Sequence, residues 1–546
     1  MPIKSTGCAT CRKRKIRCDE TRPKCNRCKI HGVPCPGYRT PAPGEVKFHD
    51  ETHGIVMQYG GGRGASQGRR LSADSGKGSS IISWSSSPDV LNTVEQEIDM
   101  SALFLHPANN GGNPLDFASV YPTPNYIPSP ALEKSQIYSK FIDTYLPKRI
   151  GAQDAHFSFL SHILSTPNLR PEVTTALDAL SMVQVGSTFN DPGLLRSAVK
   201  SYSFALTGLV RTIGKGENAL NDDYVLATVN LLASCEFFDE IAQMGSGWSH
   251  HIQGSQQLLK ARGPESIQSR LALLLFLNMR HGALSHALIA RKACFLGTPE
   301  WRAVAYRVPV VDNSTLLYDS GLQIPAILER FDALEAQADK PLEEIDALLE
   351  HSRRLEAEMR NWFLEFQRGA EIGGIMLWSL ADVDCFSTFA GLVSDRTITE
   401  FFAFPNFMIA YLVCVYWDLM HFLRTTIQKL HMARHRIDHD WYPESGEMVV
   451  EEELLEYVMN MCRCFAYFCE PMSSSTGQIG IFLPMRTAAI YFTTRGNWTY
   501  LKWVGAVKDN VFVKGMHPPS ARAIEAAQAT SSSRSPSSSA SPPAVG

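Results

Sequence analysis

The chain has 546 residues, of which 44% are hydrophobic and 20% charged, with a formal net charge of −3, and these values predict a soluble globular protein of two or three domains. The first 13 residues hold no apolar run typical of a signal peptide, and the most apolar stretch, residues 401–417, is broken by Pro405 and Asn406 and is too short for a membrane helix. We therefore expect an intracellular protein without membrane contact, in which residues 401–417 form a buried helix.

Positive charge is concentrated in a predicted first domain, residues 1–39. This head contains eleven Lys or Arg residues against two acids, a net charge of +9, which leaves −12 for the rest of the chain. A basic head on an acidic body indicates that the head alone binds a polyanion.

Six of the 13 cysteines lie close together in this head, namely Cys8, Cys11, Cys18, Cys25, Cys28 and Cys35. The first three recur 17 residues later, so the segment is an internal duplication with three thiols in each half. In a reducing compartment this density favours metal over disulfides. Zinc takes four ligands in a tetrahedron, and six sulfurs can satisfy two zinc ions only if two sulfurs bridge both metals. The pattern predicts two zinc ions, with one bridging sulfur from each half.

A single zinc ion on Cys8, Cys11, Cys25 and Cys28 is the alternative. It would leave Cys18 and Cys35 without a role, although both occupy the same place in their halves. The duplication therefore favours the two-zinc interpretation.

Between Cys11 and Cys18, five of six positions are cationic: Arg12, Lys13, Arg14, Lys15 and Arg17. The matching stretch of the second half, residues 29–34, carries one lysine. A short helix held at both ends by thiolates would present these cations to the major groove, where Arg pairs with guanine O6 and N7. The first half is thus predicted to bind DNA and the second to support it; a solvated basic face or a nuclear localisation signal is the alternative.

Residues 7–20, 23–28 and 35–38 resemble the fungal binuclear zinc-cluster transcription factors, with every cysteine in place. The resemblance implies a module of two short helices around two zinc ions, with Cys8 and Cys25 as the bridging pair. It also implies that Arg14 and Lys15 contact the bases of a CGG-like triplet, while Arg12, Lys13 and Arg17 mainly contact phosphates.

Residues 40–128 are rich in Gly, Ser and Pro and are predicted to be a disordered linker. They lack the three or more heptads of a coiled coil, so a dimer paired in that way is not expected. Ser72 follows two arginines, as in a basophilic kinase site. Acidic and apolar residues alternate over residues 85–107, which suits either an activation segment or a helix docked on the body.

Residues 129–516 are predicted to form an all-helical body, so that the fold is mainly α. The first helix should begin at Pro130 and stop at Pro147, and others should start near Asn221 and Glu451. Strand-like alternation is confined to residues 307–311. Residues 517–546 are rich in Ser and Pro and are predicted to be a disordered tail.

Residues 248–264 resemble a signature of the family's regulatory body, in its second fungal-specific class. Trp248, Ile252, Ser255 and Leu259 form one helical stripe, and Gly254 is expected to permit a close helix contact. In the same segment, His250 and His251 are expected to be packed or capped and not catalytic.

Three histidines, at positions 431, 435 and 439, share one face of a predicted helix, but they lack an acidic partner and are expected to be solvated. We find no nucleophile and base and expect no enzymatic activity. The sequence therefore predicts a nuclear, zinc-dependent regulator of RNA polymerase II genes that binds double-stranded DNA and the transcription machinery. A homodimer through the helical body and a small-molecule effector stay open. The alternatives are an enzyme or sensor with an appended zinc module, and a zinc-stapled adaptor.

Overall fold

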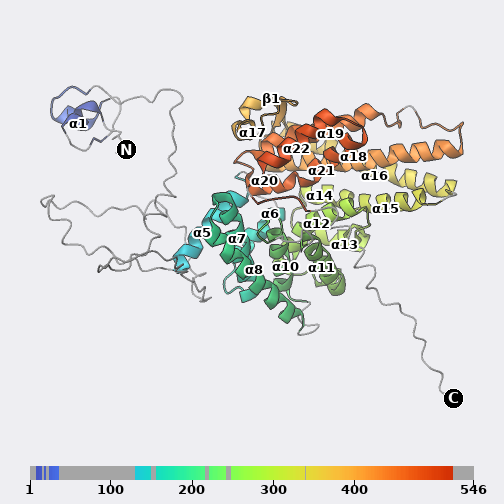
Figure 1. Cartoon of the computed structure of the whole chain (residues 1–546), viewed down its shortest axis with the longest axis horizontal. Helices are drawn as coiled ribbons and strands as arrows, with labels where there is room; N and C mark the ends of the chain where they lie inside the picture. Colours follow the sequence, from blue (N-terminus) through green and yellow to red (C-terminus); the bar gives the residue numbers. More distant parts are fainter. Residues whose placement is uncertain are drawn as a thin grey trace, which may run out of the picture. The chain divides into compact units, whose positions relative to one another are not determined.

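The computed structural model describes residues 8–14, 18–19, 24–35, 130–148, 155–214, 221–241, 247–337, 340–444, 446–513 and 515–519. The chain divides into two compact units at Ile82 and Ser83, and we describe each by itself (Figure 1). The predicted linker, Ser72, the segment 85–107 and the tail beyond residue 519 lie outside the described residues.

The N-terminal unit contains two five-residue helices, α1 (Ala9–Lys13) and α2 (Asn26–Ile30). The two helices pack against each other. Both bounds of α2 lie 17 residues after those of α1, so the backbone repeats the duplication of the cysteines. The predicted pair of short helices is therefore confirmed.

The body is helical over most of its described length. Its first helices are α5 (Pro130–Tyr145), α6 (Ala155–Ser165), α7 (Pro171–Phe189), α8 (Pro192–Ile213), α10 (Asp223–Cys235), α11 (Gly247–Arg262) and α12 (Arg270–Ala290). Helix α8 begins at a proline, and the Asp191 side chain before it accepts hydrogen bonds from the N–H groups of Gly193 and Leu194, which caps the helix. The predicted start and end of α5 are confirmed, because Pro130 opens the helix and Pro147 follows it.

Helices α7 and α8 form an antiparallel pair. Near the start of α7, Glu172 accepts a hydrogen bond from Thr212 near the end of α8 (3.4 Å). At the other end, Gly186 lies so close to Leu195 that a Cβ atom placed on the glycine would be only 3.0 Å from the leucine side chain. Helix α7 also packs against α5 and α10, so it lies at the centre of this half of the body.

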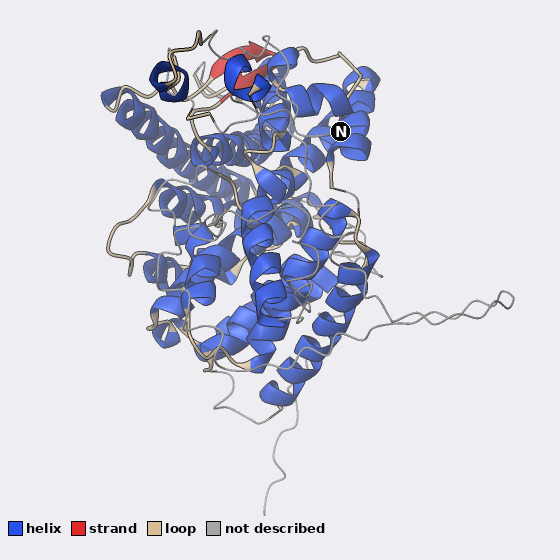
Figure 2. Ribbon diagram, turned by 90° about the vertical axis from the view of Figure 1, so that its left-hand side faces the viewer, coloured by secondary structure: helices blue, strands red, loops and turns tan. Residues whose placement is uncertain are grey.

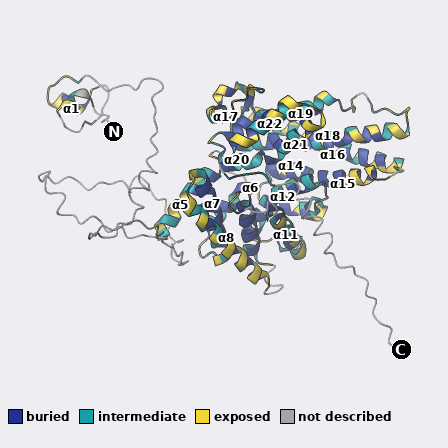
Figure 3. Cartoon of the chain, in the orientation of Figure 1, coloured by how far each residue is buried: buried dark blue, intermediate teal, exposed yellow. Residues whose placement is uncertain are grey.

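The second half of the body follows without a break in the hydrophobic core. Its short elements are η3 (Pro264–Ser266), η4 (Phe295–Gly297), α13 (Pro299–Ala305), α14 (Asn313–Gly321), η5 (Val383–Cys385), α17 (Ser387–Leu392) and α20 (Ser474–Gly480). Its longer helices are α15 (Ile324–Glu335), α16 (Leu342–Ile372), α18 (Phe407–Ile437), α19 (Glu451–Cys469), α21 (Phe482–Thr494) and α22 (Trp498–Val511). In Figure 3 the inward faces of these helices are buried and their outward faces exposed.

Helices α16 and α18, each 31 residues long, run antiparallel, as Figure 1 shows. Arg434 near the end of α18 pairs with Asp346 near the start of α16 (2.9 Å), and Tyr416 stacks on Phe363 at the opposite end. Between them, Arg424 binds Glu356 of α16 and Glu453 of α19, which joins three helices in one ion-pair network.

The body is not all-helical, which corrects one sequence prediction. Strand β1 (Ser379–Asp382) pairs antiparallel with β2 (Glu400–Ala403), and β2 packs against α19. The strand-like alternation of residues 307–311 produces no strand, since residues 307–310 form turns and bends. The buried helix predicted over 401–417 begins only at Phe407, because Pro405 interrupts the chain and the Asn406 side chain caps the helix.

Two helices, α12 and α18, are long and apolar enough to cross a membrane by length and composition alone. In the folded chain 67% and 83% of their most apolar windows are buried inside the body. Core packing accounts for their hydropathy.

The stripe predicted on α11 is confirmed, because Trp248, Ile252 and Leu259 are buried, together with Ser255. The close helix contact predicted at Gly254 is wrong, since nothing lies within 4 Å of a Cβ atom placed there. The close approach occurs at Gly282 of α12, where a Cβ atom would lie 2.7 Å from the Ile252 side chain.

Residues 515–519 return to the segment before α11. Asp239 N–H donates to the Gly515 carbonyl (2.6 Å), and His517 N–H donates to the Phe237 carbonyl (3.0 Å). Met516 is buried beside this bridge. These contacts dock residues 515–517 against the segment that precedes α11.

Asp418 of α18 gives the body a pH-dependent stability. It is buried, and its Oδ1 accepts a hydrogen bond from the hydroxyl of Thr487 of α21 (2.7 Å). Burial raises the pKa of Asp418 to about 7 against a usual value of 3.8. The folded chain therefore holds a proton that the unfolded chain loses, and stability falls as the pH rises from about 4 to about 7.

We expect Asp418→Asn to raise the free energy of unfolding by roughly 2–4 kcal/mol at pH 8 and to change it little at pH 4. Urea denaturation at both pH values measures this difference. Asp382→Asn, at an exposed position, is the control and should have little effect at either pH. An equal effect of Asp418→Asn at both pH values would contradict the assignment.

Candidate zinc and DNA-binding module

The two halves of the N-terminal unit fold by the same local interactions. Cys8 precedes α1, and its sulfur accepts a hydrogen bond from Cys11 N–H (3.4 Å). Cys25 precedes α2, and its sulfur accepts from Cys28 N–H (3.3 Å). A sulfur at the first position of each Cys-x-x-Cys pair therefore satisfies an N–H group that a helix start leaves open.

Two further contacts support the module. The Asp19 carboxylate accepts a hydrogen bond from Asn26 N–H (3.0 Å) and so caps α2. The Thr10 hydroxyl of α1 donates to the Pro34 carbonyl (2.8 Å), which joins the first half to the second. Neither contact was predicted from the sequence, because Asp19 lies seven residues before Asn26 and Thr10 lies 24 residues before Pro34, both outside the reach of local capping signals.

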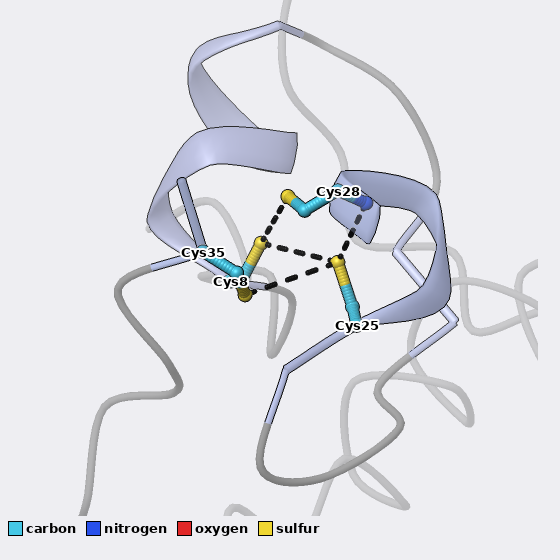
Figure 4. A group of neighbouring side chains, drawn as sticks. All are labelled: Cys8, Cys25, Cys28 and Cys35. Carbon is cyan, nitrogen blue, oxygen red and sulfur yellow. Dashed lines mark hydrogen bonds between the residues drawn. The ribbon is translucent and has the colours of Figure 1, made fainter. Parts of the chain in front are cut away.

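The six cysteines converge on two overlapping sets of sulfurs. One set is Cys8, Cys11, Cys18 and Cys25, and the other is Cys8, Cys25, Cys28 and Cys35. Within each set all sulfurs lie within 4.8 Å of one another. Cys8 and Cys25 belong to both sets, and their sulfurs are 3.7 Å apart (Figure 4).

These distances fit tetrahedral zinc. With Zn–S bonds of about 2.3 Å, sulfurs at the corners of a tetrahedron lie roughly 3.8 Å apart. The Cys8–Cys28 and Cys11–Cys25 sulfurs are both 3.7 Å apart, and Cys35 lies 4.0 Å from Cys25. The geometry thus accommodates one metal ion in each set.

The single-zinc alternative, on Cys8, Cys11, Cys25 and Cys28, is also compact, since the Cys11 and Cys28 sulfurs are 3.9 Å apart. It does not explain why Cys18 completes one set of four and Cys35 the other. Two ions sharing Cys8 and Cys25 use every sulfur, and this arrangement accounts for the whole cluster.

Burial makes this cluster depend on a cation. Burial, together with neighbouring thiols, raises the pKa of Cys11 to about 12, and burial also raises the pKa of Cys25 and Cys28. Thiols of this kind are neutral near pH 7, whereas zinc binds the thiolate. A divalent cation supplies the positive charge that allows the sulfurs to lose their protons together.

The predicted DNA-binding cations are only partly described. Lys13 is the last residue of α1, Arg14 follows it, and both side chains are exposed. Arg12 lies within α1, while Lys15 and Arg17 lie outside the described residues. In the second half, the residues 17 positions after Lys13 and Arg14 are Ile30 and His31. The two halves therefore have similar helices, but the second lacks the basic side chains of the first at these positions.

In the described part of the chain, His431, His435 and His439 do not converge with other metal-binding side chains, and the prediction that all three are solvated is wrong for His431. His431 is buried, with Nε2 3.4 Å from Arg353, and His435 contacts the Trp441 carbonyl through Nδ1 (3.0 Å). Helix α18 ends at Ile437, so His439 does not continue the predicted helical face. Among the described residues, the converging groups of three or more metal-binding side chains are the two cysteine sets.

His251 is packed, as the sequence predicts, whereas His250, for which the same was expected, is exposed. The His251 Nε2 lies 2.8 Å from the Tyr202 hydroxyl and 3.8 Å from Glu236, and burial lowers the pKa of His251 to about 4. A neutral imidazole with these neighbours joins α8, α10 and α11.

Comparisons with known proteins match two parts of the chain. Residues 6–44 match the fungal Zn(2)-Cys(6) binuclear cluster domain, and residues 136–299 match the fungal specific transcription factor domain. No solved structure matches the chain.

Several curated proteins share sequence with it. An uncharacterized protein of Emericella nidulans is 28% identical over 203 residues, which is 35% of this chain and 43% of the relative. The Zn(2)-C6 fungal-type transcription factor afumD of Aspergillus fumigatus is 57% identical over 30 residues, 6% of this chain and 8% of the relative. The aspercryptin biosynthesis cluster-specific transcription regulator atnN of Emericella nidulans is 54% identical over 39 residues, 7% of this chain and 6% of the relative. The chain thus covers less than half the length of each.

Proposed function

Because the chain belongs to the fungal Zn(2)-Cys(6) binuclear-cluster transcription factors, we propose that it is a zinc-dependent, DNA-binding regulator of transcription. The cluster domain binds two zinc ions. We assign one ion to Cys8, Cys11, Cys18 and Cys25 and the other to Cys8, Cys25, Cys28 and Cys35, the two sets whose sulfurs converge.

The exposure of Lys13 and Arg14 at the end of α1 carries the DNA-binding proposal. The sulfurs of Cys8 and Cys11 fix this helix, and Arg14 N–H donates to the Thr10 carbonyl (3.0 Å), which continues the helical turn past Lys13. The two cations therefore project from a rigid support, which reduces the entropy lost when they bind DNA.

We assign base contacts in a CGG-like triplet to Arg14 and Lys15, and phosphate contacts to Arg12, Lys13 and Arg17. A guanidinium can donate two hydrogen bonds to guanine O6 and N7, and an ammonium reads the same edge less selectively. Phosphate contacts set affinity and its salt dependence but carry no sequence information.

Arg14→Ala is expected to reduce the preference for a CGG-containing duplex over a scrambled one, by roughly 10–100-fold, because one bidentate contact discriminates by about 1–3 kcal/mol. Lys13→Ala is expected to weaken binding to both duplexes equally and to reduce the salt slope by about 1. Fluorescence anisotropy with both duplexes at several salt concentrations measures these effects.

Lys29→Ala is the matched control, because Lys29 is exposed on α2 at the position equivalent to Arg12 in the duplicated half. It should retain both affinity and specificity. Identical profiles for the Arg14 and Lys13 variants would contradict the assigned roles, and a large loss in the Lys29 variant would assign DNA contact to the second half.

For the rest of the chain we propose a nuclear protein that regulates RNA polymerase II genes without enzymatic activity. The helical body, residues 129–516, would regulate the activity of the head and contact the transcription machinery, with a homodimer and a small-molecule effector as further partners. The match of residues 136–299 to the fungal specific transcription factor domain supports this division of labour.

A further inference from the structure

Strand β1 has one paired edge and one open edge. It pairs with β2 and with no other strand among the described residues. Val383 N–H donates to the opposite Thr399 carbonyl (2.8 Å), which makes this a hydrogen-bonded pair. Because such pairs alternate with non-bonded pairs along antiparallel strands, Leu380 and Asp382 direct their N–H and C=O groups away from β2. The Asp382 carbonyl belongs to the N-cap of η5, whereas the N–H and C=O groups of Leu380 and the N–H group of Asp382 make no backbone hydrogen bond to a described loop or turn.

Large apolar side chains lie along the segment that leads into this edge. Leu380 is 56% exposed, Met376 72% and Ile372 82%, whereas Phe402, opposite Leu380 on β2, is buried. The two strands lie at the periphery of the body, where they are drawn red in Figure 2. Several exposed apolar groups beside an open strand edge are typical of a surface that pairs with another chain.

The charge around the edge indicates the kind of chain. Three carboxylates, those of Asp382, Asp384 and Glu400, are exposed on the two strands or directly after β1. A second copy of this chain would bring the same three carboxylates to the edge and would be repelled. A cationic segment would be attracted.

We propose that the open edge of β1 is a docking site for an extended segment of a partner protein in which an apolar and a cationic residue stand two positions apart, on the same face. The segment would add a third strand beside β1, with hydrogen bonds to the backbone of Leu380 and Asp382. Because Leu380 and Asp382 stand two positions apart on β1, their side chains lie on the same face, where an apolar side chain of the segment would cover Leu380 and a cation two positions along would face the Asp382 carboxylate. This site lies in the body and goes beyond the proposed DNA-binding function.

The test uses the full chain and a fluorescein-labelled six-residue peptide in which a valine and a lysine stand two positions apart between threonines. Anisotropy should show saturable binding. The same peptide with N-methyl groups on alternate amides, which keeps charge and side chains but cannot pair with a strand, should bind at least tenfold more weakly, since two lost hydrogen bonds are worth about that factor.

Two variants at position 380 distinguish the contribution of the backbone N–H group to peptide binding from that of the side chain. Leu380→Pro removes an N–H group that points away from β2, a change that an edge strand tolerates, and should weaken peptide binding roughly tenfold. Leu380→Ala keeps the N–H group and should weaken binding by only about two- to fourfold. Both variants should bind DNA as the unmodified chain does.

Equal binding of the N-methylated and unmodified peptides would overturn the proposal, because the attraction would then be charge alone. Absence of saturable binding would overturn it as well. Self-association of the chain that Leu380→Pro abolishes would instead assign the edge to a second copy.

Discussion

Cys25→Ser is expected to release both zinc ions and to abolish DNA binding. The Cys25 sulfur belongs to both four-sulfur sets, so its loss leaves each ion with three sulfurs. Structural zinc contributes on the order of 10–16 kcal/mol of apparent free energy per site in small modules, more than two five-residue helices could replace. Zinc content per chain, measured by mass spectrometry, and duplex binding provide the readouts.

Two further cysteine variants serve as comparisons for Cys25→Ser. Cys18→Ser removes a sulfur from one set only and should leave part of the zinc bound. Cys385→Ser replaces an exposed cysteine of the body and should retain two ions and full DNA binding. A Cys25→Ser chain that still holds one zinc ion as tightly as before would show that Cys25 does not bridge.

The second large effect is expected in the body, where Asp319→Asn should lower the free energy of unfolding by about 3–5 kcal/mol. The buried Asp319 carboxylate accepts hydrogen bonds from Arg280 (3.3 Å), Arg302 (2.7 Å) and Tyr306 (3.3 Å). Arg280 is only 1% exposed, and burial lowers its pKa. The neutral amide would leave this buried guanidinium without a counter-charge.

Asp332→Asn is the matched control for this variant. Asp332 accepts two hydrogen bonds from Arg291 (2.7 and 2.6 Å), so the contacts resemble those of Asp319, but the Arg291 and Asp332 side chains are 35% and 44% exposed to solvent. An exposed ion pair contributes about 0–1 kcal/mol. Denaturant unfolding of the two variants should therefore differ by several kcal/mol, and equal destabilisation would show that burial of the Asp319 site does not matter.

The capping and stripe signals of the body were predictable because they depend on neighbouring residues. Pro130 and Pro147 bound α5, and the stripe from Trp248 to Leu259 identifies the buried face of α11. The β1–β2 pair was not predictable, since each strand has four residues and its partner lies about 20 residues away. The prediction for Gly254 was wrong because a close helix contact also depends on the residues of the facing helix. In the contact between α11 and α12, the glycine that makes room is Gly282 of α12, which faces Ile252.

The sequence by itself determined the metal chemistry of this protein. Ligand type and a 17-residue repeat are local properties, and six sulfurs with that spacing leave few ways to surround zinc. The tertiary structure decided which carboxylates are buried, where Asp319 meets Arg280, and that β1 keeps an open edge. These features depend on contacts between residues far apart in the chain, whose free energy appears only when the body packs and excludes water.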